Sequence, residues 1–162
     1  MTAARTQATL TALYRGYAHS VLRRAERMLG TRADAEDVLQ DLFTRWQQRP
    51  AELEAMREPA AFIYSATTNA CLNRLRDGKT RRRLLADRTP IDAAADAPLG
   101  EARVLLREAL ALLPAELQTI AVYYYLDEMT QEEIAEVAGC ARRTVSDHLA
   151  RIQRTLGKER KQ

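Results

Sequence analysis

The sequence contains few of the residues that crosslink a chain or interrupt its regular structure. Among 162 residues there are 2 cysteines, 6 glycines and 5 prolines. Cys71 and Cys140 lie far apart, and neither has a second cysteine or a histidine at metal-ligand spacing. We therefore predict two buried thiols and no metal site.

Long apolar runs are also missing. None approaches the length of about 20 residues that a membrane-spanning helix needs. The N-terminal segment MTAARTQATL lacks the apolar core and the small-residue cleavage site of a signal peptide. A composition of 46% hydrophobic and 29% charged residues is typical of a soluble globular protein. We expect a cytoplasmic protein with no membrane insertion.

No segment alternates apolar and polar residues with period two, so we expect no sheet. Apolar residues recur at helical spacing instead, which predicts an all-α fold. The spacing predicts a helix over 10–29, ended by Gly30, and a second helix over 31–48, ended by Pro50. Residues 49–58 are predicted to form a loop.

Composition divides the chain in two. Pro59 begins a helix that continues into a basic segment. Residues 87–100, DRTPIDAAADAPLG, are rich in Ala, Asp and Pro and have little apolar periodicity. We predict two small helical domains, residues 1–86 and 101–162, joined by a flexible linker over 87–100.

The second domain is predicted to open with two helices. The first covers residues 101–113, and the second begins at Pro114 and ends at Asp127 and Glu128. The apolar residues expected to face inward from the second helix are Leu117, Ile120, Ala121 and Tyr124.

The segment 130–150 has the pattern of a helix-turn-helix. Thr130 and Glu133 match a capping box, and Gly139 suits the tight turn between two helices. The second helix begins near Arg142, with one apolar stripe for its own domain and one polar side for a major groove. The stripe comprises Val145, Leu149, Ile152 and Leu156, and the polar side comprises Arg142, Arg143, Thr144, Ser146, Asp147, His148 and Arg151. Asp147 either accepts from a cytosine amine or faces Arg143 or Arg151 one turn away. This segment predicts DNA binding.

Charge is unevenly distributed along the first domain. Residues 74–83 hold six basic residues and one Asp, a net +5, whereas residues 31–41 hold one Arg and four carboxylates, a net −3. The two segments therefore suggest two partners, one polyanionic and one not.

The whole chain resembles an extracytoplasmic-function sigma factor of the sigma-70 family. DAEDVLQDLFTRW (34–46) resembles the region 2 helix that docks on the RNA polymerase beta-prime clamp. PAAFIYSATTNACLNRLRDGKTRRR (59–83) resembles the helix that melts and reads the minus-10 element, and residues 113–156 resemble region 4, which reads the minus-35 element. The resemblance implies a promoter-recognition subunit of RNA polymerase that needs no cofactor and no ATP.

The resemblance also implies the site residues. Those for core polymerase are Asp34, Asp37, Gln40, Asp41, Leu42 and Trp46. Those for the minus-10 element are Asn69 and Asn73, whose amides can read unpaired bases, and the phosphate-binding Arg74, Arg76, Lys79, Arg81, Arg82 and Arg83. Those for the minus-35 element are Thr130, Gln131, Arg142, Arg143, Thr144, Ser146, Asp147, His148 and Arg151. Tyr64 either stacks on a base or is partly buried.

The sequence departs from the family pattern at several positions. Phe62 and Ile63 stand where a tryptophan is common in the minus-10 helix, and Ala141 removes a good N-cap from the recognition helix. Arg143 replaces a frequent glycine, and Asp147 replaces a frequent serine. These changes bear on the promoter sequence. Family members are often inhibited by an anti-sigma factor, so we expect such a partner as well.

Two other classes of protein fit the sequence less well. A stand-alone helix-turn-helix regulator is commonly a dimer that reads two half-sites, but the C-terminal GKERKQ is short and polar. An enzyme would need a phosphate loop, a metal constellation or a nucleophile–histidine pair, and none is present in the sequence. We therefore expect no catalytic residues.

Overall fold

The computed structural model describes the backbone of residues 2–86 and 100–159, and the side chains of residues 2–78 and 106–157. Contacts divide the chain into two compact units, Met1–Arg74 and Leu75–Gln162. Residues 87–99 of the predicted linker lie outside the described residues, and the predicted domain boundaries stay predictions.

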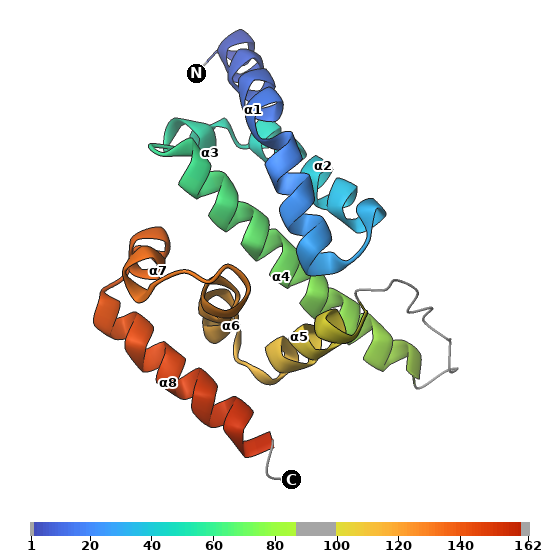
Figure 1. Ribbon diagram of the computed structural model, residues 1–162. Coiled ribbons are helices and arrows are strands. Elements are labelled where there is room, and N and C mark those ends of the chain that lie inside the picture. The colour runs from blue at the N-terminus through green and yellow to red at the C-terminus, as the bar shows by residue number, and fades with distance from the viewer. Residues whose placement is uncertain (1, 87–99, 160–162) are drawn as a thin grey trace. The chain divides into compact units, whose positions relative to one another are not determined.

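Every regular element in the described part of the chain is a helix, as Figure 1 shows. The elements are α1 (Ala3–Leu29), α2 (Arg32–Gln48), α3 (Pro50–Glu54), α4 (Pro59–Ala86), α5 (Gly100–Leu112), α6 (Ala115–Ala121), η1 (Val122–Leu126), α7 (Gln131–Ala138) and α8 (Arg142–Glu159). The predicted all-α fold is confirmed.

In the first unit, α1 and α2 lie side by side as a helical hairpin with a tight turn (Figure 1). Gly30 ends α1 with φ of 97°, a left-handed conformation that favours glycine. Thr31 then caps α2, since its hydroxyl oxygen accepts from the backbone N–H of Asp34 at 3.1 Å. Both helix ends agree with the sequence-based prediction.

Trp46 is the largest fully buried side chain of this unit and is 1% exposed. Its ring lies 5.0 Å from that of Phe43 and 5.7 Å from that of Phe62 on α4, measured between centroids. Phe43 in turn meets Tyr14 of α1 edge to face at 5.2 Å. Such edge and tilted contacts between rings are favourable beyond the area they bury. The aromatic side chains therefore join α1, α2 and α4.

The segment 49–58 is not wholly a loop, so that prediction was wrong. Pro50 follows the end of α2 and also occupies the first position of α3, where its missing N–H leaves no intrahelical bond unmade. Leu53 of α3 is buried and adds to the core. Because α3 has only five residues, it is too short to display a helical period in the sequence.

In the second unit, Gln118 of α6 is buried against the end of α5. Its Nε2 donates to the carbonyl oxygens of Leu110 at 2.9 Å and Leu113 at 3.3 Å. Carbonyl groups at a helix C-terminus lack intrahelical donors, so this amide supplies what the helix cannot. The bond fixes where α5 gives way to α6.

The chain between α6 and the helix-turn-helix widens into the π-helix η1. The Asp127 N–H bonds the Val122 carbonyl, five residues back, at 3.1 Å. The wider turn shifts the buried side, so Val122 and Tyr123 are buried while Tyr124 is 36% exposed. The prediction that Tyr124 faces inward was wrong, because a period of 3.6 residues does not anticipate a π-turn.

Candidate nucleic-acid interface

The residues of α2 predicted to bind polymerase divide into a buried and an accessible set. Leu42 and Trp46 are buried in the core of the first unit. Gln40 and Asp41 are exposed, Asp37 is exposed, and Asp34 is half-buried. Gln40 and Asp41 are accessible to a partner, whereas Leu42 and Trp46 are enclosed in the core.

Arg74 of α4 bonds to two of these acidic side chains. Its Nη2 donates to Asp37 Oδ2 at 2.5 Å and to Asp34 Oδ1 at 3.1 Å, and its Nε donates to Asp34 Oδ1 at 3.2 Å. Partial burial lowers the pKa of Arg74, but the hydrogen bonds that it donates to Asp34 and Asp37 outweigh this effect, and the pKa is raised. The structure therefore joins one residue predicted for DNA to two predicted for polymerase.

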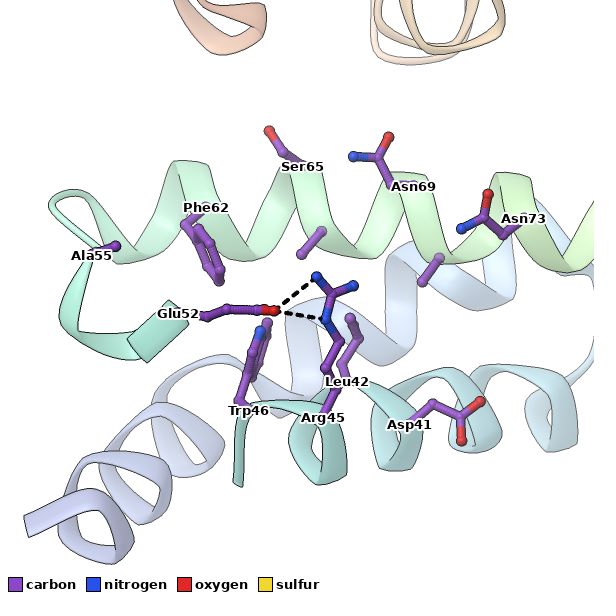
Figure 2. A pocket seen from close by; sticks show the side chains of 12 residues that line it. Asp41, Leu42, Arg45, Trp46, Glu52, Ala55, Phe62, Ser65, Asn69 and Asn73 are labelled. Atoms are coloured by element: carbon purple, nitrogen blue, oxygen red, sulfur yellow. Dashed lines mark hydrogen bonds and ion pairs between the residues drawn. The ribbon is translucent and has the colours of Figure 1, made fainter. Parts of the chain in front are cut away.

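A groove of about 600 Å³ lies between α2, α3 and α4, and Figure 2 looks into it. Asn69 and Asn73 are exposed and follow Ser65 in one row along α4. Beneath them, Arg45 donates to Glu52 Oε1 through Nη2 at 3.0 Å and Nε at 3.2 Å. The lining residues are Asp41, Leu42, Arg45, Trp46, Glu52, Ala55, Phe62, Ser65, Ala66, Asn69, Ala70 and Asn73.

The aromatic residues of α4 have intramolecular contacts. Phe62 lies against Trp46, and Ile63 is buried. The guanidinium carbon of Arg24 lies 3.8 Å from the centroid of the Tyr64 ring, and Arg24 Nε donates to Thr68 Oγ1 at 2.9 Å. Tyr64 is half-buried and stacked on Arg24, which agrees with the second of the two readings of this residue. Sequence reasoning missed Arg24, because nothing in its neighbours signals a contact with α4.

The remaining basic residues of α4 are only partly described. Arg76 is half-buried, and its Nη1 donates to Gln118 Oε1 at 3.2 Å within the second unit. Lys79, Arg81, Arg82 and Arg83 have side chains that lie outside the described residues. Their predicted phosphate contacts stay predictions.

The helix-turn-helix has the caps and the core that the sequence predicts. Thr130 Oγ1 accepts from the Glu133 N–H at 3.2 Å, and the Thr130 N–H donates to Glu133 Oε2 at 2.8 Å. The Thr130 backbone and side-chain bonds lower the pKa of Glu133. Gly139 has φ of 65° in the turn. The fully buried side chains that hold α7 against α8 include Ile134, Val145 and Ile152.

The polar residues predicted to contact DNA lie mostly on the accessible surface of this motif. Thr130, Arg142, Arg143, Ser146, Asp147 and Arg151 are exposed, and Gln131, Thr144 and His148 are half-buried. The Nδ1 atom of His148 is buried with no hydrogen-bond partner among the described residues.

Two of the four arginines on α8 form ion pairs within the unit. Arg142 Nε lies 2.7 Å from Glu132 Oε1, and Arg151 Nη2 lies 3.2 Å from Glu116 Oε1. Within residues 106–157, Arg143 and Asp147 form no ion pair, so Asp147 does not pair with either neighbouring arginine. The sequence did not predict the acidic partners Glu132 and Glu116, because each lies on another helix.

The described residues contain no group of three or more His, Cys, Asp or Glu side chains that could hold a metal ion. In the same part of the chain, no helix is both long enough and apolar enough to cross a membrane.

Each of the two units matches the model of a known protein family. The family model "Sigma-70 region 2" matches residues 13–82, and "Sigma-70, region 4" matches residues 103–156. The ECF RNA polymerase sigma factor SigL of Mycobacterium tuberculosis is 30% identical, over 95% of this chain and 90% of its own length. SigW of Bacillus subtilis, also an ECF RNA polymerase sigma factor, is 26% identical, over 88% of this chain and 84% of its own length.

A chain in the solved RsbN–BldN complex is 21% identical over 98% of this chain and 99% of its own length, with a TM-score of 0.34. That likeness is too weak to carry an argument. The two region matches, in this order along the chain, together with the identity to SigL, are decisive. The chain belongs to the extracytoplasmic-function group of the sigma-70 family, the RNA polymerase sigma factors that recognise promoters.

Proposed function

We propose that the groove of the first unit reads the minus-10 element through Asn69 and Asn73. The observation that carries this proposal is that both amides are exposed in one row beside the groove. An amide offers a donor and an acceptor, so it can recognise the edge of a base that has left the stack. The neighbouring basic residues Arg76, Lys79, Arg81, Arg82 and Arg83 would hold the strand through salt-sensitive phosphate contacts.

The exposed side of α2 is the surface that we assign to core polymerase. Gln40 and Asp41 lie there, and the buried Leu42 and Trp46 keep the helix in place. Asp41 also lines the groove, so the polymerase-facing and DNA-facing residues adjoin one another.

In the second unit, Arg143 is our candidate for base readout in the minus-35 element. It is exposed, and it forms no ion pair among the side chains of 106–157, unlike Arg142 and Arg151. An arginine can bond a guanine edge with two donors, and Asp147 could accept from a cytosine amine. Thr130, Gln131, Thr144, Ser146 and His148 would add phosphate or base contacts around them.

Several further features of the proposal come from the family. The protein acts in the cytoplasm as a non-catalytic subunit, without cofactor, and an anti-sigma factor controls its access to polymerase and DNA. Residues 1–86 and 101–162 work as separate domains, and the segment 87–100 lets them engage the two promoter elements.

In vitro run-off transcription tests the proposed function. The full chain, added to core polymerase and genomic fragments, should start transcripts at defined sites that core polymerase alone does not use. Absence of transcripts, under conditions in which a control sigma factor is active, would contradict the proposal. A stable dimer that binds a palindrome without polymerase, detected by gel filtration and gel shift, would contradict it too.

A further inference from the structure

Two contacts, at matching positions, join α2 to α4 in the first unit. At one end the ring of Trp46 lies 5.7 Å from that of Phe62. At the other end Arg74 bonds Asp34 and Asp37. Asp34 to Trp46 and Phe62 to Arg74 each span twelve residues, about 18 Å of helix. The two helices are therefore antiparallel, with an aromatic contact at one end and an ionic contact at the other.

The groove described above lies between these two contacts. The α4 side of the groove begins with Phe62 and continues with small or polar residues, Ser65, Ala66, Asn69, Ala70 and Asn73. The aromatic contact at Phe62 and the ionic contact at Arg74 lie at the two ends of this row and help to set the distance between α4 and α2.

Asp34, one of the two acidic partners of Arg74, is itself held in place. Asp34 Oδ2 accepts from the hydroxyl of Thr31, the N-cap of α2, at 2.6 Å, while its Oδ1 accepts from Arg74. Both oxygens of Asp34 are thus engaged within the unit. Its position in the first turn of α2 also places its negative charge at the positive end of the helix dipole.

From this geometry we infer that Arg74, Asp34 and Asp37 are positioning residues that set the minus-10-reading face of α4 against the polymerase-binding helix α2. Arg74 then does not bind phosphate, and Asp34 and Asp37 do not bind polymerase, although the family resemblance implies those roles. The inference rests on the proposed minus-10 role of Asn69 and Asn73. If the inference holds, the position of α4 along α2 determines promoter opening.

A positioning role and a direct phosphate contact predict opposite effects on promoter binding when Asp37 loses its charge. If Arg74 bound a phosphate, removing the charge of Asp37 would release a cation for DNA and strengthen promoter binding. If the cluster positions α4, removing either partner weakens it. The three side chains are 35% to 56% exposed, so the effect is modest, about three- to fivefold.

The test uses the full chain with core polymerase and the variants Arg74→Gln, Asp37→Asn and their combination. Core affinity is measured by competition, and promoter complexes are counted at several salt concentrations. Arg32→Gln is the matched control, because Arg32 also begins α2 and pairs with Glu36 at 2.9 Å without reaching α4. Asp37→Asn leaves the Arg74–Asp34 bonds, so it serves if Arg74→Gln does not fold by circular dichroism.

We expect both single variants to form three- to fivefold fewer promoter complexes, with core affinity unchanged within about twofold and an unchanged salt slope. The double variant should be no worse than the more severe single variant. Two results would overturn the inference in favour of a phosphate contact. In one, Arg74→Gln lowers by about 1 the slope of log affinity against log salt concentration; in the other, Asp37→Asn binds the promoter more tightly. Weaker core binding by Asp37→Asn alone, or no change in promoter complexes, would also overturn it. Failure of the wild-type chain to form complexes would instead contradict the proposed function.

Discussion

The two units place their charged side chains in different ways. In the first, Arg74 bonds carboxylates that lie 37 and 40 residues away in the sequence and so links two helices. In the second, the capping box of Thr130 and Glu133 closes within one helical turn, and Arg143 forms no ion pair among the side chains of 106–157, although Arg151 reaches Glu116, 35 residues away. Local charge patterns are visible in a sequence, whereas pairs between distant helices are not. A charged block in a sequence is therefore a poor guide to which charges reach a partner.

The cysteines give the largest predicted difference between the units. Burial raises the pKa of the Cys71 thiol to about 12, from an ordinary value of 9.0. Its thiolate fraction below pH 9 is then roughly a thousandfold lower than that of an ordinary thiol. Cys140 is half-buried in the second unit, so the prediction of a buried thiol is confirmed for Cys71 and was wrong for Cys140. Labelling of the native protein at pH 8 should modify Cys140 first and Cys71 at least a hundredfold more slowly.

Cys140→Ser is the control and should remove the fast phase of labelling. Equal rates at the two thiols would mean that α4 opens readily in the native protein. That result would contradict a first unit held closed between α2 and α4.

Trp46→Ala should have the next largest effect, confined to the first unit. Deleting a fully buried ring leaves a cavity and typically costs about 3–5 kcal/mol of unfolding free energy. Urea denaturation followed by circular dichroism should show an early transition for one unit and an unchanged transition for the other. Gln47→Ala, an exposed neighbour, should change the free energy by less than about 0.5 kcal/mol. An equal shift of both transitions would show that the units unfold together.

Changes at the helix N-caps should act on the second unit. Thr130→Ala removes the capping box and should lower the free energy of unfolding by about 1 kcal/mol. Ala141→Ser should instead raise the free energy of unfolding. The Ala141 carbonyl accepts from the Val145 N–H at 3.3 Å, so Ala141 occupies the N-cap position of α8 and a serine there can cap the helix. Thermal unfolding measures both variants, and a destabilising Ala141→Ser would contradict the assigned cap.

The smallest effect is expected for the ion pair between α7 and α8. Glu132→Gln should change the unfolding free energy by less than about 0.5 kcal/mol, since both side chains are about two-thirds exposed. Glu136→Gln on the same helix is the control and should be equally silent. A loss above about 1 kcal/mol in Glu132→Gln alone would mean that the pair fastens the two helices.

The fold was largely predictable, because most helices are long enough to display their period and their ends carry local signals. Gly30, Thr130 and Gly139 are such signals, and the structure confirms each. The short α3 and the π-turn before Tyr124 were missed, since neither leaves a periodic pattern. Within the site, the exposure of Asn69 and Asn73 agreed with expectation.

The intramolecular partners within the site could not be predicted. Arg24 covers Tyr64, and Glu116 holds Arg151, across 35 or more residues of sequence in each pair. Only the folded chain brings such residues together. The sequence therefore gave Arg151 a DNA-binding role and Arg24 no role, although both bond within the chain.

The most direct test of two separate promoter-reading units is run-off transcription with four templates: intact, minus-10 mutated, minus-35 mutated, and both. Asn69→Ala with Asn73→Ala should lose discrimination between minus-10 sequences and keep the preference at minus-35. Arg143→Ala should do the reverse. If either change abolished discrimination at both elements, or at the element assigned to the other unit, the account would be contradicted.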